Sequence, residues 1–319
     1  MPKTDKIYKE KMKHTAWFRS ARYGMFIHFG LYSIPARGEW VQSQEKLTAA
    51  QYAQFFKEFK PAYNCSAHWT ETAAAAGMKY AVLTAKHHDG FCLFDSKHTD
   101  YKITNTPYKK DLVKEYLDNC RKNNIKTGPY YSLVDWHHPH YPAWQDRQHP
   151  MRDNPEYQHK KIDFDKYLEY MHSQVKELCE NYGKIDLLWF DFSYHDMRGE
   201  KWKAAELVKK IRKLQPEIII NNRLGGYMLT DNPDIYAGDF CGPEQIIPRQ
   251  AVTDYQGRPV AWETCLTLND HWGYAAADHN YKSDRFLIQA LINCVSKNGN
   301  LLLNVGPAPD GQIPAPACD

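Results

Sequence analysis

Several carboxylates in this sequence stand next to apolar runs that are typical of a protein core. Asp191 ends the run LLWFD at 187–191, Glu263 lies in VAWETC at 260–265, and Glu244 lies between them along the chain. A carboxylate that is buried without a partner is costly. Asp191 therefore either caps a following segment, a role that Asp often has, or takes part in chemistry. Two carboxyl groups at the mouth of one pocket could cleave a glycosidic bond, one attacking or stabilising the sugar cation and the other protonating the leaving oxygen.

Other polar and aromatic residues follow the apolar runs in the same way. Each alone has an ordinary explanation, because a histidine after a strand is usually structural and an arginine often forms a surface ion pair. Their accumulation after five or more runs points instead to a shared site. The residues at these positions are His28, His87, His88, Asp89, Tyr130, Tyr131, Asp135, Asn222, Arg223 and Asp239. Trp189, two residues before Asp191, would lie on the same face of a strand, where it either fills the core or contacts a ligand.

The 15 histidines also raise the question of a metal. The segment WHHPHY at 136–141, or His28 together with His87, could supply nitrogen ligands. Histidines beside prolines in a loop are a weak signal, however, and no HExxH pair is present. The sequence therefore favours carboxylate chemistry without a metal or other cofactor, and keeps a metal-dependent hydrolase as an alternative.

The elements that would position these residues alternate along the chain. Apolar runs predict strands, and most segments between them have the amphipathic pattern of helices that end at Gly or Asn. Up to eight strands separated by helices indicate a parallel sheet, and their count fits a closed TIM-like (β/α)8 barrel better than an open sheet. The predicted strands are 24–30, 79–88, 126–132, 185–191, 217–223, 234–240, 260–265 and 300–306, and the predicted helices are 52–59, 69–77, 111–124, 164–183, 201–215 and 283–299.

In such a barrel, the residues that follow the strands meet at one end, where active sites lie. No GxGxxG motif follows the first predicted strand, which argues against a doubly wound nucleotide-binding fold. Only the segment 307–319 follows the last predicted strand. Either the segment 5–20 covers the face that a final helix would cover, or the chain is a truncated version of something longer.

Composition limits the function further. The chain has 319 residues, 43% of them hydrophobic and 25% charged, and its net charge of +3 gives no reason to expect nucleic acid or membrane partners. The 22 Tyr and 9 Trp suit flat sugar rings, although they also suit core packing. The eight cysteines are scattered singly, and the N-terminus has no apolar signal-peptide region. We therefore expect a cytoplasmic protein, with secretion still open if the N-terminus is incomplete, and the oligomeric state stays unknown.

Six motifs occur in a characteristic order along most of the chain. They are WFRSARYGMFIHFGLYS, GMKYAVLTAKHHDGFCLFDSKHTDY, LLWFDF, NNR, WETCLTLNDHWGY and NGNLLLNVGPAPDGQIP. Together they resemble glycoside hydrolase family 29, the α-L-fucosidases, from about residue 17 to residue 314. The combination of KHHDGF with the strand end WFD is specific, and the ordered set is more so.

The resemblance implies a retaining exo-α-L-fucosidase that hydrolyses terminal α-L-fucosyl residues of oligosaccharides or glycans by double displacement. It implies one (β/α)8-like catalytic domain over 1–319, with an N-terminal extension at 1–16 and a short tail at 307–319, and without the C-terminal β-sandwich of many members. Asp191 matches the family's nucleophile, and Phe192 stands where many relatives have glycine. By motif, the residues of the fucose pocket are His28, Glu39, Trp40, His87, His88, Tyr131, Trp189, Arg223 and Trp272.

The acid/base residue varies in position across the family. The sequence WE followed by DHWGY resembles members that use this glutamate, so Glu263 is predicted as the acid/base and Glu244 in CGPEQIIP is its rival. Retention needs the two carboxyl groups about 5–5.5 Å apart, whereas inversion needs roughly 6.5–9.5 Å. Besides the metal-dependent hydrolase, a non-catalytic sugar-binding barrel stays an alternative, although a binding protein does not need an acid pair.

Overall fold

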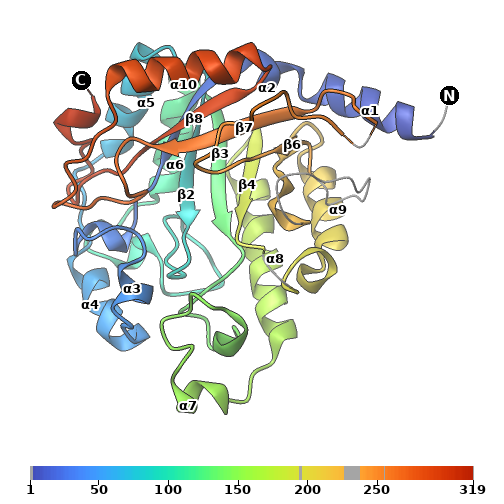
Figure 1. Cartoon of the computed structure of the whole chain (residues 1–319). Helices are drawn as coiled ribbons and strands as arrows, with labels where there is room; N and C mark the ends of the chain where they lie inside the picture. The colour runs from blue at the N-terminus through green and yellow to red at the C-terminus, as the bar shows by residue number, and fades with distance from the viewer. Residues whose placement is uncertain (1–2, 194–195, 226–237, 255, 319) are drawn as a thin grey trace.

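Eight parallel strands form the centre of the protein, in the order β5-β4-β3-β2-β1-β8-β7-β6 (Figure 1). The computed structural model describes residues 3–193, 196–225, 238–254 and 256–318. Asn221 and Phe240 form a parallel bridge between the two outer strands of this order, which closes the sheet into the expected (β/α)8 barrel. The strands are β1 (Tyr23–Ile27), β2 (Tyr80–Lys86), β3 (Lys126–Ser132), β4 (Leu187–Asp191), β5 (Ile219–Ile220), β6 (Phe240–Cys241), β7 (Ala261–Thr267) and β8 (Asn300–Val305).

All six predicted helices are present, with ends that differ by a few residues. The helices are α1 (Lys3–His14), α2 (Ala16–Ala21), α3 (Val41–Gln44), α4 (Ala49–Glu58), α5 (Cys65–Ala75), α6 (Leu112–Lys122), α7 (Pro155–Gln158), α8 (Phe164–Asn181), α9 (Ala204–Leu214) and α10 (Asp284–Ser296). The fifth and sixth strands are shorter than predicted, and residues 234–237 of the predicted sixth strand lie outside the described residues. Within the described ranges, no helix is long and apolar enough to cross a membrane.

Helix starts follow from side chains that accept hydrogen bonds from the first turn. Thr48 and Gln51 form a capping box at α4, in which each side chain bonds the backbone N–H of the other. Asp111, Asp163 and Ser283 cap α6, α8 and α10 by accepting from the third backbone N–H that follows each of them. These caps fix where each helix begins relative to the strand that precedes it.

The side chains of each strand alternate between two cores, as expected for a period of two residues. One core lies between the strands and the surrounding helices. The other fills the barrel interior and is dominated by aromatic and aliphatic side chains. Its strand residues are Phe26, Tyr80, Val82, Tyr130, Leu187, Trp189, Ile219, Phe240, Ala261, Cys265 and Leu302.

The amino-terminal end of the barrel is closed by the short helix α2. Phe18 on this helix lies with its ring centroid 5.4 Å from that of Tyr80 and 4.5 Å from that of Phe240. Gly24 of β1 leaves room for this contact, because a Cβ at that position would lie 2.6 Å from the Tyr80 ring. The N-terminal segment therefore plugs this end of the barrel, while the carboxyl ends of β2 and β3 point toward α3, α4 and α7 (Figure 1).

Candidate active site

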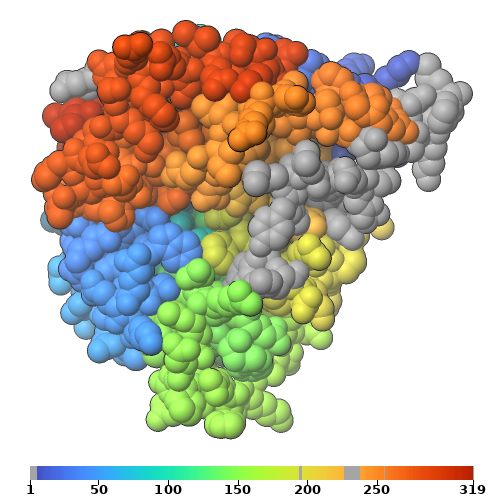
Figure 2. Space-filling model, viewed as in Figure 1, coloured from blue at the N-terminus to red at the C-terminus, as the bar shows by residue number. Residues whose placement is uncertain are grey.

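A pocket opens at the carboxyl ends of the strands, where the barrel fold places active sites. Figure 2 shows a hollow where the blue segment after β1, the green segment after β3 and the orange segments around β7 meet. Including its opening to solvent, the hollow has a volume of about 430 Å³. It is lined by Phe26, His28, Glu39, Trp40, His87, His88, Tyr130, Trp189, Asp191, Phe192, Arg223, Glu244, Cys265 and Trp272.

Asp191 is the last residue of β4, and its carboxylate faces this pocket. Oδ1 accepts hydrogen bonds from Arg223 Nη1 at 2.9 Å and from the Phe192 backbone N–H at 2.8 Å. Oδ2 accepts a hydrogen bond from the Tyr130 hydroxyl at 2.8 Å, and His88 Nε2 lies 3.9 Å away. The strand thus delivers a carboxylate that is held from several sides but keeps access to the cavity.

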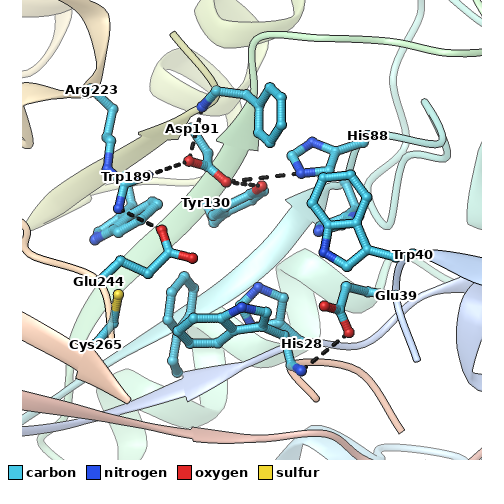
Figure 3. A pocket seen from close by; sticks show the side chains of 14 residues that line it. His28, Glu39, Trp40, His88, Tyr130, Trp189, Asp191, Arg223, Glu244 and Cys265 are labelled. Carbon is cyan, nitrogen blue, oxygen red and sulfur yellow. Dashed lines mark hydrogen bonds and ion pairs between the residues drawn. The ribbon is translucent and has the colours of Figure 1, made fainter. Parts of the chain in front are cut away.

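Arg223 joins Asp191 to a second carboxylate. Its Nη2 donates to Glu244 Oε2 at 2.8 Å, so one guanidinium holds both acids (Figure 3). The Arg223 guanidinium carbon also lies 4.9 Å from the centre of the Trp189 ring, a cation–π arrangement. Glu244 is 42% exposed and stands at the rim, so it can approach both the cavity and solvent.

Burial dominates the electrostatics of the pocket floor. It raises the pKa of Asp191 to about 6, although the positive charge of Arg223 and the Tyr130 hydrogen bond act in the opposite direction. The negative charge of Glu244 adds to the rise. The two acids therefore interact electrostatically, and Arg223 compensates part of their mutual repulsion.

Three histidines form the polar side of the pocket. Burial lowers the pKa of His28 to about 3, and it lowers the pKa values of His87 and His88 well below the ordinary value, so all three are neutral near pH 7. His28 Nδ1 is bonded to Asn304 at 2.6 Å, and His88 Nδ1 to Ser132 at 2.7 Å. Because these partners use one ring nitrogen, the other nitrogen of each ring remains for a ligand hydroxyl.

Aromatic side chains form the apolar side. The Trp40 ring lies 5.2 Å from His88, and the Trp272 ring lies 5.1 Å from His28. The carboxyl group of Glu39 is bound to the backbone. Its Oε2 accepts hydrogen bonds from the backbone N–H groups of Trp272 at 3.1 Å and Gly273 at 2.8 Å. Glu39 thereby fixes the backbone that carries Trp272, in addition to lining the cavity.

The structure does not support Glu263 as the acid/base residue. Glu263 is 1% exposed and does not line the pocket. It is the third residue of β7, so its side chain lies inside the barrel beneath the pocket floor. Its two oxygens accept hydrogen bonds from Trp189 Nε1 and from the Tyr80 hydroxyl, each at 2.7 Å. Glu244, the rival in the sequence prediction, occupies the position at the rim.

Tyr131 is likewise not part of the pocket, and its neighbour Tyr130 takes its place. Tyr130 pairs in register with Trp189 and faces the barrel interior, so the alternation of β3 turns Tyr131 outward. The Tyr131 hydroxyl donates to Gln174 of α8 at 2.7 Å. The sequence prediction also missed Phe26 and Cys265, which lie two positions from His28 and Glu263 on the same strand faces. Counting by two from those residues could have found them.

Phe192 lines the pocket in an unusual backbone conformation. Its φ is +76°, a left-handed region that glycine occupies easily and bulky residues rarely. The ring lies 4.6 Å from His88 and 5.7 Å from Trp40, so packing on the pocket wall stabilises it there. Glycine would adopt the same backbone conformation without this cost.

The histidine-rich segments give no support for a metal. Among the described residues, no three His, Cys, Asp or Glu side chains are arranged to hold a metal ion. The side chain of His137 instead stacks on Tyr101, with the ring centroids 4.0 Å apart.

A parallel barrel whose mouth holds two linked carboxylates among aromatic rings and neutral histidines is typical of the glycoside hydrolases. The chain belongs to the α-L-fucosidase family, because the family model for alpha-L-fucosidase matches residues 2–318. Plasma alpha-L-fucosidase of Homo sapiens is 28% identical over 93% of this chain and 64% of its own length. Tissue alpha-L-fucosidase of Bos taurus is 30% identical, also over 93% of this chain and 64% of its own. The chain thus spans less than two thirds of the length of these curated relatives.

Solved structures agree with this assignment. Alpha-L-fucosidase isoenzyme 1 from Paenibacillus thiaminolyticus has a TM-score of 0.94 and 57% identity, over 97% of this chain and 73% of that one. Unliganded alpha-L-fucosidase AlfC from Lactobacillus casei has a TM-score of 0.84 and 32% identity, over 96% of this chain and 94% of that one. Both similarities extend over nearly all of this chain.

Proposed function

We propose that the protein is a retaining exo-α-L-fucosidase that hydrolyses terminal α-L-fucosyl residues of oligosaccharides or glycans. The observation that carries this proposal is the Arg223 side chain, which binds Asp191 and Glu244 at the mouth of the pocket. Neutral histidines beside them can bind sugar hydroxyls in either direction, since a neutral imidazole has one donor and one acceptor. The aromatic wall suits the apolar ring face and the C6 methyl group of fucose.

Asp191 would act as the nucleophile. Its carboxylate attacks C1 of the fucosyl residue, and the bond from C1 to the leaving oxygen breaks with its electron pair moving to that oxygen. Water then attacks C1 of the fucosyl-enzyme, which releases fucose and restores the Asp191 carboxylate. The hydrogen bonds from Arg223 and Tyr130 favour the ionised form that this attack requires.

Glu244 would act as the acid/base. In the first step it gives its proton to the leaving oxygen, and in the second it removes a proton from the attacking water. One guanidinium can bridge only carboxyl groups that lie close together, which suits the short spacing of about 5–5.5 Å in retaining enzymes. The exposure of Glu244 at the rim also suits a group that meets both the leaving sugar and water.

The choice of fucosides is supported by the relatives. AlfC chains have been solved in complex with the product alpha-L-fucose, with 4-nitrophenyl-a-L-fucopyranoside and with Fuca(1,6)GlcNAc. For this chain we propose fucosides as the substrate class. A panel of α-1,2, α-1,3/4 and α-1,6 fucosyl oligosaccharides would determine the linkage.

The test is to follow cleavage of 4-nitrophenyl α-L-fucoside by proton NMR in real time. A retaining enzyme releases α-L-fucose first, and the β anomer then grows by mutarotation. Initial release of β-L-fucose would refute the retaining mechanism, and no cleavage of any fucoside would refute the function. Glu244→Gln should lose about 100-fold or more on a substrate with a poor leaving group but far less on an activated aryl fucoside. Equal losses on both would exclude Glu244 as the acid.

A further inference from the structure

Glu263 connects the pocket floor to the deeper barrel interior. Of its two oxygens, Oε1 accepts a hydrogen bond from Trp189 Nε1 and Oε2 accepts one from the Tyr80 hydroxyl. With 1% of its surface exposed, the carboxyl group has no route to a substrate in the pocket. A carboxyl group at such a buried position is costly unless its hydrogen bonds compensate.

The carboxyl group of Glu263 holds the Trp189 ring in place through the hydrogen bond from its indole N–H. The indole lines the pocket and is stacked on Tyr130, with ring centroids 5.6 Å apart and an interplanar angle of 19°. On its face lies the guanidinium of Arg223, at 4.9 Å. The hydrogen bond from the indole N–H to Glu263 therefore fixes the orientation of the surface on which Arg223 rests.

Arg223 in turn binds both carboxylates of the proposed reaction. Nη1 contacts Asp191 and Nη2 contacts Glu244. If the indole rotated, the guanidinium would lose its support and the spacing of the two acids would change. Displacements of about 1 Å in a catalytic group can cost on the order of 100-fold in rate.

We propose that Glu263 is a positioning residue, which orients Trp189 beneath Arg223 and thereby sets the geometry of Asp191 and Glu244. This inference rests on the proposed function, since it assigns Glu263 a role in that reaction without contact to the substrate. What matters for this role is the length of the side chain and its acceptor oxygen, whereas an acid/base role would depend on an ionisable group.

Two conservative variants separate these requirements. Glu263→Gln keeps the length and offers its carbonyl oxygen to Trp189, while its amide group can donate to the Tyr80 hydroxyl, which also accepts. Glu263→Asp keeps an ionisable carboxyl group but is one methylene too short to reach both partners. We expect the Gln variant to retain kcat within about threefold, and the Asp variant to lose roughly 10- to 100-fold in kcat. The loss should be equal for good and poor leaving groups, and azide should not restore it.

A larger loss of kcat in Glu263→Gln than in Glu263→Asp would overturn the proposal. A Gln variant that loses the poor-leaving-group substrate selectively, with recovery of aryl fucoside cleavage in azide, would make Glu263 the acid. An Asp variant with wild-type kcat would show that the bond to Trp189 has no functional effect. Glu244→Gln assayed beside them is the matched control, because it should show the leaving-group selectivity that Glu263 variants lack.

An NMR measurement tests the hydrogen bond without relying on activity. The indole N–H resonance of Trp189, assigned with Trp189→Phe, should keep its shift in Glu263→Gln and move in Glu263→Asp. If the wild-type protein cleaves no fucoside, the proposed function fails, yet this comparison still decides whether Glu263 orients Trp189. An unchanged resonance in the Asp variant would refute the positioning role itself.

Discussion

The two ends of the barrel interior are built from the same strands but have opposite chemistry. Along the inner face of β4, Leu187 at the amino end is followed by Trp189 and then by Asp191 at the mouth. At the amino end, Phe18 packs on Tyr80 and Phe240. At the mouth, Arg223 binds two carboxylates. The change from apolar side chains to charged ones thus takes place over a few residues of one strand.

This difference separates stability from chemistry within one fold. The apolar end gains its free energy from burial of aromatic surface, and it needs no access to solvent. The mouth holds buried charges and a strained backbone, which cost stability. Glu263 lies between the two ends, bonded to Tyr80 on one side and to Trp189 on the other. Its two hydrogen bonds therefore join a residue of the apolar end to a residue of the pocket wall.

The largest effect is expected from Asp191→Ala at the mouth. Without the nucleophile, kcat for an aryl α-L-fucoside should fall by about 10⁴-fold, which corresponds to roughly 5 kcal/mol of barrier. Azide, which can occupy the space of the lost carboxylate, should partly restore turnover and give β-L-fucosyl azide. Thermal unfolding should change little. Wild-type turnover in this variant would remove Asp191 from the mechanism.

The matching change at the apolar end is Phe18→Ala. It removes a fully buried ring from the plug, so the free energy of unfolding should fall by about 3–5 kcal/mol. The rate per folded molecule should stay at the wild-type level, because Phe18 touches no residue of the pocket's acid pair. Urea unfolding and steady-state kinetics at low temperature check both statements. A large loss of kcat in the folded variant would show that packing at the apolar end also affects catalysis at the mouth.

The same contrast explains how much the sequence could predict. Eight apolar runs, most of them separated by helical segments, predict the barrel, and Asp191 was predicted at the mouth because it is the last residue of its run. Glu263 was expected at the pocket mouth, but the run VAWETC shows only that a strand exists and not how far it extends. The strand continues to Thr267, which puts Glu263 below the mouth. Glu244 lies beyond β6 and takes part in an isolated bridge outside the named strands. Its segment therefore has no alternating hydrophobic pattern from which its position at the rim could be predicted.

Tyr131 was misassigned for a related reason. Two adjacent tyrosines in YYS fit either face of a strand, and only the register with β4 shows that Tyr130 pairs with Trp189. Register depends on contacts between strands that are far apart in the sequence. The backbone of Phe192 was not predicted, because a phenylalanine gives no sign in the sequence of the positive φ that the structure shows.

Between the two ends, Glu263 should make stability depend on pH. Burial raises its pKa to about 7 from a reference value of 4.5. The stability that the protonated group contributes is therefore complete below 4.5 and is lost as the pH rises through about 7. Glu263→Gln has no such proton. Relative to wild type, its unfolding free energy should improve by about 2–3 kcal/mol between pH 4 and pH 8, as measured in urea. The same difference between the two proteins at both pH values would contradict this.

The smallest change in unfolding free energy is expected for Phe192→Gly, because two effects of opposite sign nearly cancel. Phe192→Gly loses contacts with His88 and Trp40 but relieves a left-handed backbone that costs a non-glycine residue about 1–2 kcal/mol. The net change in unfolding free energy should stay within about 1 kcal/mol, far below that of Phe18→Ala. Phe192→Ala is the control, because it loses the ring and keeps the strain, so it should be less stable than the Gly variant by about 1 kcal/mol. An Ala variant as stable as the Gly variant would show that the backbone at the mouth is not strained, and that the two ends differ in chemistry alone.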